Sequence, residues 1–115
     1  MAKLDTHLIG SFDAFLSGLH HEILNGSVSA TYEDGSDFVD ASGCRVAVRV
    51  YERYSWFGGN RVSLSVTLAG SGSNLHLTAI TSGGSQAMFL KINTVGERSF
   101  LDTIRSYVRK NGGQC

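Results

Sequence analysis

The fold is decided by an alternating stretch at residues 61–69, which reads RVSLSVTLA. Its apolar side chains (Val62, Leu64, Val66 and Leu68) alternate with polar ones. Because successive residues of a strand face opposite sides of a sheet, this period of two is typical of a half-buried strand. The stretch therefore predicts a strand with one face in a hydrophobic core.

The preceding stretch, residues 44–56, alternates in the same way and is predicted to be the neighbouring strand. Pairing Val50 with Val66 aligns the apolar sets of the two strands and leaves residues 57–59, Phe-Gly-Gly, as a hairpin loop. The residues expected to face inward on this register are Val46, Val48 and Val50.

Two further strands are predicted after residue 69, at residues 75–80 and 86–93. Pairing Leu68 with Leu75 closes on the two-residue turn Ser71-Gly72, and the second hairpin closes on the pair Gly83-Gly84. The interpretation left open for residues 86–93 is a short helix. The strand run is therefore predicted to be a meander.

The N-terminal part of the chain predicts a strand at residues 3–10 and then a helix. Apolar residues recur at helical spacing from Phe12 to Leu24, after Ser11 as N-cap. Asn25-Gly26 predicts a left-handed end to this helix. Residues 28–33 read as a half-buried strand that leads into a polar, acidic turn at residues 33–37.

A second amphipathic helix is predicted near the C-terminus. Thr94 and Glu97 have the spacing of a capping box, and Asn111-Gly112 is a typical helix end. The inward residues of this helix are predicted to be Phe100, Leu101, Ile104 and Val108.

Together these elements predict a single α+β domain spanning residues 1–115. The expected order is strand, helix, four to five strands in an antiparallel meander, and helix, with both helices packed on one face. A chain of 115 residues is long enough for one core. The order resembles the TATA-binding-protein-like and helix-grip arrangements, in which a C-terminal helix lies across a curved sheet; that resemblance carries no function.

Composition excludes several classes of function. Ten basic and ten acidic residues cancel, so no net field attracts nucleic acid or an anionic membrane, and we expect neither as a partner. No run of 18 apolar residues and no signal-peptide pattern is present, which predicts a soluble, cytoplasmic protein. Adjacent His20 and His21 point about 100° apart on a helix, two cysteines make no zinc pattern, and we expect no metal or cofactor.

The predicted register sends a polar set of side chains to the outer face of the sheet. Arginine forks among hydroxyls and an aromatic ring suit an anionic ligand or, against the zero net charge, a single nucleic-acid strand. The exposed set Tyr51, Ile80 and Phe89 suits a dimer interface, and a plain solvated face is the alternative to all of these. The predicted outer residues are Arg45, Arg49, Tyr51, Arg53, Ser63, Ser65, Thr67, His76, Thr78, Ile80, Phe89 and Lys91.

Two smaller features are candidates for binding. Glu52 falls on the inward side with Tyr54, so it is either a carboxylate with a raised pKa or a group at the wet rim of the core. The turn around Gly83 and Gly84 exposes backbone N–H groups that suit an anion, unless it is an ordinary hairpin turn.

Four stretches resemble an uncharacterised family of short bacterial proteins, described as a domain of unknown function, over nearly the whole chain. They read ILNGSVSA at residues 23–30, VRVYERY at 48–54, GGNRVS at 58–63 and AITSGGSQA at 79–87. The resemblance implies no activity, substrate or cofactor, and it assigns no site residue.

No catalytic set stands out in the sequence, so we expect a non-catalytic binding or interaction domain that forms a homo-oligomer through its sheet face or a sheet edge. A small anionic or apolar ligand, held between the sheet and the C-terminal helix, fits this expectation. The alternative is an anion-binding protein or small enzyme that uses the cluster Arg49, Arg53 and Arg61 with Glu52 and the Gly83-Gly84 turn.

Overall fold

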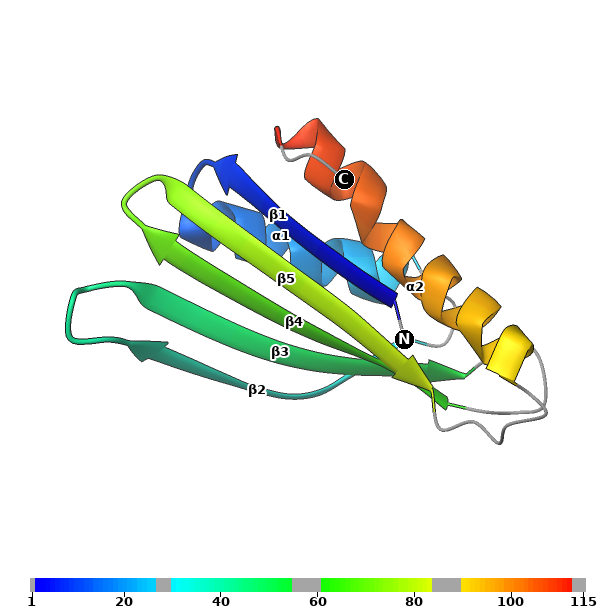
Figure 1. The fold of residues 1–115 in the computed structure, drawn as a ribbon. Helices are drawn as coiled ribbons and strands as arrows, with labels where there is room; N and C mark the ends of the chain where they lie inside the picture. Colours follow the sequence, from blue (N-terminus) through cyan, green and yellow to red (C-terminus); the bar gives the residue numbers. More distant parts are fainter. Residues whose placement is uncertain (1, 27–29, 55–60, 84–89, 113–115) are drawn as a thin grey trace.

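Five antiparallel strands and two helices make up the computed structural model, which describes residues 2–26, 30–54, 61–83 and 90–112, and of residues 54 and 90–99 the backbone alone. The strand order in the sheet is β1-β5-β4-β3-β2 (Figure 1). The predicted α+β class is confirmed. The elements are β1 (Ala2–Ile9), α1 (Phe12–Asn25), β2 (Thr31–Val39), β3 (Arg45–Tyr54), β4 (Arg61–Ser71), β5 (Asn74–Gly83) and α2 (Leu90–Lys110).

The core is built on β4, as its alternation predicts. The four apolar residues of that strand are at most 1% exposed, while their neighbours Ser63, Ser65 and Thr67 are partly exposed. Buried residues of both helices join them in one hydrophobic cluster. The helix residues in the cluster are Phe12, Phe15, Leu19 and Ile23 of α1 and Phe100, Leu101, Ile104 and Val108 of α2.

The predicted register of β3 is wrong by one residue. Arg49, not Val50, lies opposite Val66, so the two faces of β3 are exchanged. Ala47 and Tyr51 are the buried residues, at 0% and 1% exposure. A tyrosine ring buries more apolar area than a valine, and its hydroxyl has a hydrogen-bond partner on α1, so the face that carries Tyr51 turns inward.

The hairpin between β4 and β5 keeps its predicted faces but not its predicted turn. Leu68 pairs with Leu77, a shift of two residues, and the turn is Gly72-Ser73. A shift of two leaves every side chain on its face. Gly72 has a φ of 60°, which glycine adopts without strain at the first position of a type II′ turn.

The strand predicted at residues 86–93 is wrong where the structure describes it. Residues 90–93 belong to α2, and the turn residue Gly84 lies outside the described residues. The edge of β5 is paired instead with β1, with Leu8 opposite Leu75. β1 can pair with β5 because it too has alternating buried residues, Leu4, Thr6 and Leu8.

The helix ends partly match expectation. Ser11 is the N-cap of α1, with its Oγ 3.3 Å from the Ala14 nitrogen. Gly26 has a φ of −85°, so the predicted left-handed end of α1 is wrong. α2 begins at Leu90, which places Thr94 inside the helix rather than at a capping box. At the other end Gly112 has a φ of 88° and stops α2 as predicted.

The acidic stretch predicted as a turn at residues 33–37 is part of β2. All nine residues of this edge strand are exposed, and the pairing with β3 is shifted by an irregularity between Tyr32 and Asp34. Exposed charges and a bulge are common on edge strands because they oppose unwanted strand pairing. Within the described residues, neither helix is long and apolar enough to cross a membrane.

Candidate functional site

A cleft of about 420 Å³ lies between α1 and the β2–β3 side of the sheet. α1 contributes four residues that share one face of the helix, at positions i, i+3, i+4 and i+7. The strands contribute an aromatic ring, a glycine and an ion pair. The lining residues are Asp13, Leu16, Ser17 and His20 from α1 and Tyr32, Gly35, Asp37 and Arg49 from the strands.

Three aromatic rings stand together at this cleft. His20 lies 5.5 Å from Tyr32 in a T-shaped contact and 5.6 Å from Tyr51, and the two tyrosine rings are 5.7 Å apart, measured between centroids. Tyr51 is buried, whereas Tyr32 is 45% exposed. Of the two tyrosines, Tyr32 is therefore the one that is open to solvent.

Tyr51 is tied to α1 by a hydrogen bond. Its hydroxyl lies 2.8 Å from Nδ1 of His20. Burial raises the pKa of Tyr51 to about 12, because the phenolate would lose its hydration. The phenol is therefore neutral at physiological pH and serves as a polar anchor between helix and sheet.

Gly35 lies in the wall of the cleft, at a position where a larger side chain would not fit. A Cβ at this position would lie 2.5 Å from the Tyr32 hydroxyl, 2.7 Å from the Val48 carbonyl oxygen and 2.9 Å from Cδ of Arg49. The glycine allows the ring of Tyr32 to fold back across its own strand. The conformation of β2 thus positions the exposed ring.

Two ion pairs between arginine and aspartate flank the cleft. Nη2 of Arg49 donates to both carboxylate oxygens of Asp37, at 3.0 and 3.1 Å, and its Nη1 donates to the Val48 carbonyl at 2.9 Å. Arg45 donates to both oxygens of Asp13, at 3.1 and 2.8 Å. These bonds, with the charge of Arg45, lower the pKa of Asp13 below its usual range. Both carboxylates are largely exposed, at 77% for Asp13 and 64% for Asp37.

The register of β3 divides the predicted arginine cluster between two faces. Arg49, Tyr51 and Arg53 were expected on the outer face, but they lie on the inner face with the core. The guanidinium carbon of Arg53 is 4.7 Å from the centroid of the Phe100 ring, and burial lowers the pKa of Arg53. Arg45 was also expected on the outer face, but its guanidinium carbon lies 4.2 Å from the centroid of the Phe12 ring.

Glu52 and Arg61 lie on the outer face instead, where they form an ion pair. The hydroxyl of Ser63 donates to Glu52 at 3.4 Å. Glu52 is therefore not a carboxylate in apolar surroundings, which was one of its two predicted placements. It lies at the outer surface of the sheet, with its side chain 24% exposed. The same exchange of faces that buries Tyr51 brings Glu52 out.

The remaining predicted site residues are only partly described. Tyr54 pairs with Arg61 through the backbone, and Gly83 ends β5 opposite Val62. Gly84 and Phe89 lie outside the described residues. The outward placement of Ser63, Ser65, Thr67, His76, Thr78 and Ile80 is confirmed, with Ile80 38% exposed.

The residues that line the cleft were largely missed in the sequence. A signal was present: Asp13, Ser17 and His20 recur at helical spacing beside the apolar stripe of α1. Tyr32 was expected to be half-buried, and Asp37 was assigned to a turn. The described residues contain no group of three His, Cys, Asp or Glu side chains placed to hold a metal ion.

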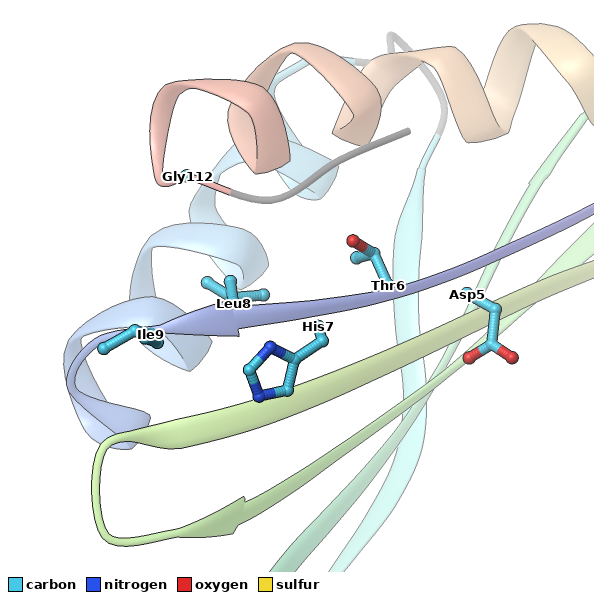
Figure 2. A pocket seen from close by; sticks show the side chains of 6 residues that line it. All are labelled: Asp5, Thr6, His7, Leu8, Ile9 and Gly112. Atoms are coloured by element: carbon cyan, nitrogen blue, oxygen red, sulfur yellow. The ribbon is translucent and has the colours of Figure 1, made fainter.

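A second hollow, of about 570 Å³, follows the free edge of β1. Its wall consists of five consecutive residues, Asp5 to Ile9, with Gly112 at the end of α2. Figure 2 shows Thr6 and Leu8 directed toward the helices and Asp5 and His7 directed away from them. A wall of consecutive residues means that backbone as well as side chain borders this hollow.

The comparisons with known proteins identify a family but no activity. The family described as "Family of unknown function (DUF6054)" matches residues 1–112. No curated protein and no solved structure matches the chain. The chain therefore belongs to the DUF6054 family, as its resemblance to a domain of unknown function implied.

Proposed function

We propose that this member of the DUF6054 family is a non-catalytic binding domain that assembles as a homo-oligomer. Its ligand is a small planar molecule that carries positive charge or N–H donors, and it occupies the cleft between α1 and the β2–β3 strands. The observation that carries this proposal is the exposed ring of Tyr32, which shares one cleft with two exposed carboxylates.

The polar groups of the cleft favour a donor over an acceptor. Asp13 and Asp37 offer carboxylate oxygens that each have room for a second hydrogen bond beyond the one received from arginine. An aromatic face attracts a cation placed over it, by about 0.5–1 kcal/mol at an exposed site. A flat cation over Tyr32 with its N–H groups toward Asp37 uses both features.

The alternative is an anionic ligand at Arg49, as an anion-binding protein or enzyme would need. Nη2 of Arg49 already donates to both carboxylate oxygens of Asp37, and the Arg49 side chain is only 17% exposed. An incoming anion would have to displace Asp37 and leave that carboxylate without its partner. This exchange makes an anion the weaker candidate.

A matched pair of probes separates the two hypotheses. Benzamidine and benzoate have the same ring and nearly the same shape but opposite charge. We expect benzamidine to raise the Tm of the protein in a saturable manner, because a ligand that binds only the folded state stabilises it. We expect benzoate to leave Tm unchanged.

Variants then assign the effect to the cleft. Tyr32→Leu and Asp37→Asn are expected to abolish most of the shift caused by benzamidine, whereas Ser63→Ala, on the outer face, is a control expected to retain it. A shift caused by benzoate and lost in Arg49→Gln would support the anionic alternative. No shift with either probe would contradict the ligand class proposed.

The assembly part of the proposal rests on β1 and β2, the two edge strands of the sheet in the described part of the chain. An edge strand presents unpaired backbone groups to which another strand can add. Sedimentation at micromolar concentration tests this part separately from ligand binding: a monomeric mass would contradict it.

A further inference from the structure

We propose that two copies of this chain pair through the free edges of β1, as antiparallel strands related by a twofold axis at Thr6, so that their two sheets become one. This inference deepens the homo-oligomeric part of the proposed function and rests on it. It names the surface, the partner and the register.

The direction of the backbone groups along β1 follows from the neighbouring hairpin. The two-residue turn Gly72-Ser73 closes on Ser71 opposite Asn74, so the N–H and C=O of Asn74 face β4 and those of Leu75 face β1. Leu75 lies opposite Leu8. The backbone groups of even-numbered residues in β1 are therefore used by β5.

A hydrogen bond beside the strand agrees with this assignment: the nitrogen of Gly10 donates to the carbonyl oxygen of Ser73 at 2.9 Å. By alternation, the N–H and C=O groups of odd-numbered residues point away from the sheet. Those residues are Lys3, Asp5, His7 and Ile9. The hollow of about 570 Å³ along residues 5–9 lies on this edge of the sheet (Figure 2).

Parity and charge select one register for a second β1. Odd residues must lie opposite odd ones, because only these have outward backbone groups to exchange. With Thr6 on the twofold axis, Asp5 lies opposite His7, Lys3 opposite Ile9 and, on the inner face, Leu4 opposite Leu8. The two buried leucines of the inner face then meet each other, and the acidic Asp5 meets the basic His7 of the second copy.

Neighbouring registers are less favourable. An axis through Asp5 places two carboxylates opposite each other, which is destabilising. An axis through Leu4 pairs Lys3 with Asp5 but leaves His7 and Ile9 beyond the overlap. The register centred on Thr6 keeps the two Asp5 carboxylates apart and pairs nearly the whole strand.

The other free edge is a poorer surface for a second copy. β2 carries Glu33, Asp34 and Asp37 and contains no basic residue, so two β2 strands would bring acids together. In β1 the Oδ1 atom of Asp5 already accepts hydrogen bonds from His76 at 2.6 Å and Thr78 at 2.8 Å, which holds the carboxylate on the outer face where the second copy's His7 would lie. Charge complementarity therefore favours β1.

A cysteine at the twofold axis tests the register directly. Thr6 would face its counterpart in a non-hydrogen-bonded pair, with Cβ atoms about 4.5–5.5 Å apart. Thr6→Cys, made with Cys44→Ser and Cys115→Ser so that no other thiol is present, is expected to form a covalent dimer on mild oxidation. Ser36→Cys, on the edge of β2, is the matched control and is expected to stay monomeric on a non-reducing gel.

A charge swap gives a second measurement that does not depend on cysteine. His7→Asp would face the second copy's Asp5 and is expected to lower the sedimenting mass to that of a monomer at micromolar concentration. Combining it with Asp5→Lys is expected to restore the dimer.

The outcomes separate this inference from the function on which it rests. A dimeric wild type that cross-links at Thr6 and not at Ser36, with a swap that restores assembly, supports it. A dimer that fails to cross-link at Thr6 and ignores His7→Asp overturns the β1 interface while leaving homo-oligomer formation intact. A monomeric wild type overturns both, and the response to benzamidine is unaffected by either result.

Discussion

Tyr51 and His20 make the contact, at the scale of single residues, that joins the candidate site to the core. The Tyr51 ring is part of the hydrophobic cluster, and its hydroxyl meets His20 at the cleft. The same residue therefore contributes to stability and to the shape of the site. Its removal should be measurable in both.

Tyr51→Phe is expected to lower the free energy of unfolding by about 1 kcal/mol, the usual net value of a buried hydrogen bond, since the polar nitrogen of His20 loses its partner. Urea denaturation at pH 7 measures this change. Tyr32→Phe is the control: the residue is 45% exposed, so we expect a smaller loss. An unchanged midpoint for Tyr51→Phe would show that the hydrogen bond does not contribute.

The pH dependence of stability follows from the same residue. The pKa of Tyr51 is about 12 in the folded protein and 10.0 for the unperturbed group, so the folded state holds this proton more tightly. The stabilisation is fully present below pH 10 and is lost as the pH rises toward 12. The free energy of unfolding should fall across this window, by at most about 1.4 kcal/mol per pH unit from this one group.

The difference between wild type and Tyr51→Phe isolates this effect, because burial also raises the pKa of Tyr107. Urea unfolding curves at several pH values between 9 and 11.5 would provide it. A constant difference across these pH values would contradict the burial of an ionisable Tyr51.

Single residues of the site were harder to predict than those of the core. The burial of four residues of β4 can be predicted from alternation alone. They are Val62, Leu64, Val66 and Leu68. The burial of Tyr51 could not be predicted in this way. Its strand carries valines on one face and arginines on the other, and hydropathy predicts that the valine face is buried. The arginines can face inward because Arg45 and Arg53 cover the rings of Phe12 and Phe100 with their guanidinium groups.

At the scale of elements, α1 rests on β4 at a glycine. A Cβ on Gly70 would lie 2.6 Å from Cδ2 of Phe12 and 3.0 Å from Cδ2 of Leu75, and both of these side chains are buried. Gly70→Ala should therefore destabilise the protein by about 1–3 kcal/mol, the range for overpacking in a core. Thermal or urea unfolding measures the loss.

Gly10→Ala provides the comparison, because nothing lies within 4 Å of a Cβ at that position. It should change stability by no more than about 0.5 kcal/mol, as is usual for such sites. Equal effects of the two substitutions would contradict the close approach of α1 to β4.

The elements themselves were well predicted from local sequence, and their pairing less so. Helix α1 and strand β4 have strong periodicity and a cap or turn at their ends. The partner of β5 was not local: β1 and β5 are more than sixty residues apart in the sequence, whereas residues 86–93 follow β5 directly. Pairing β5 with the segment that follows it in the sequence therefore gave a wrong prediction, because its partner is β1.

At the scale of the whole molecule, the cleft lies at the β2 and β3 end of the sheet, beside α1. β2 and β3 pair with each other, and β2 is an edge strand of the sheet. The cleft depends on this arrangement, since α1 contributes one wall and the edge of the sheet the other. Only the assembled fold could show it.

If the chain is a dimer whose folding and assembly are coupled, its apparent Tm should depend on protein concentration. We expect Tm to rise when the concentration is increased by about a factor of ten, because mass action favours the associated folded state. Differential scanning calorimetry at the two concentrations measures the shift. A Tm independent of concentration would indicate that assembly adds nothing to stability.

The central claim is that the cleft beside Tyr32 binds a planar cation, and residue-level NMR tests it most directly. Titration of ¹⁵N-labelled protein with benzamidine should shift the amide resonances of Ser17, His20, Gly35 and Asp37 along one saturable curve, while those of Ser65 and Thr67 on the outer face stay in place. Benzoate should leave all of them unchanged. Shifts confined to residues outside the cleft, or equal responses to the two probes, would contradict the account.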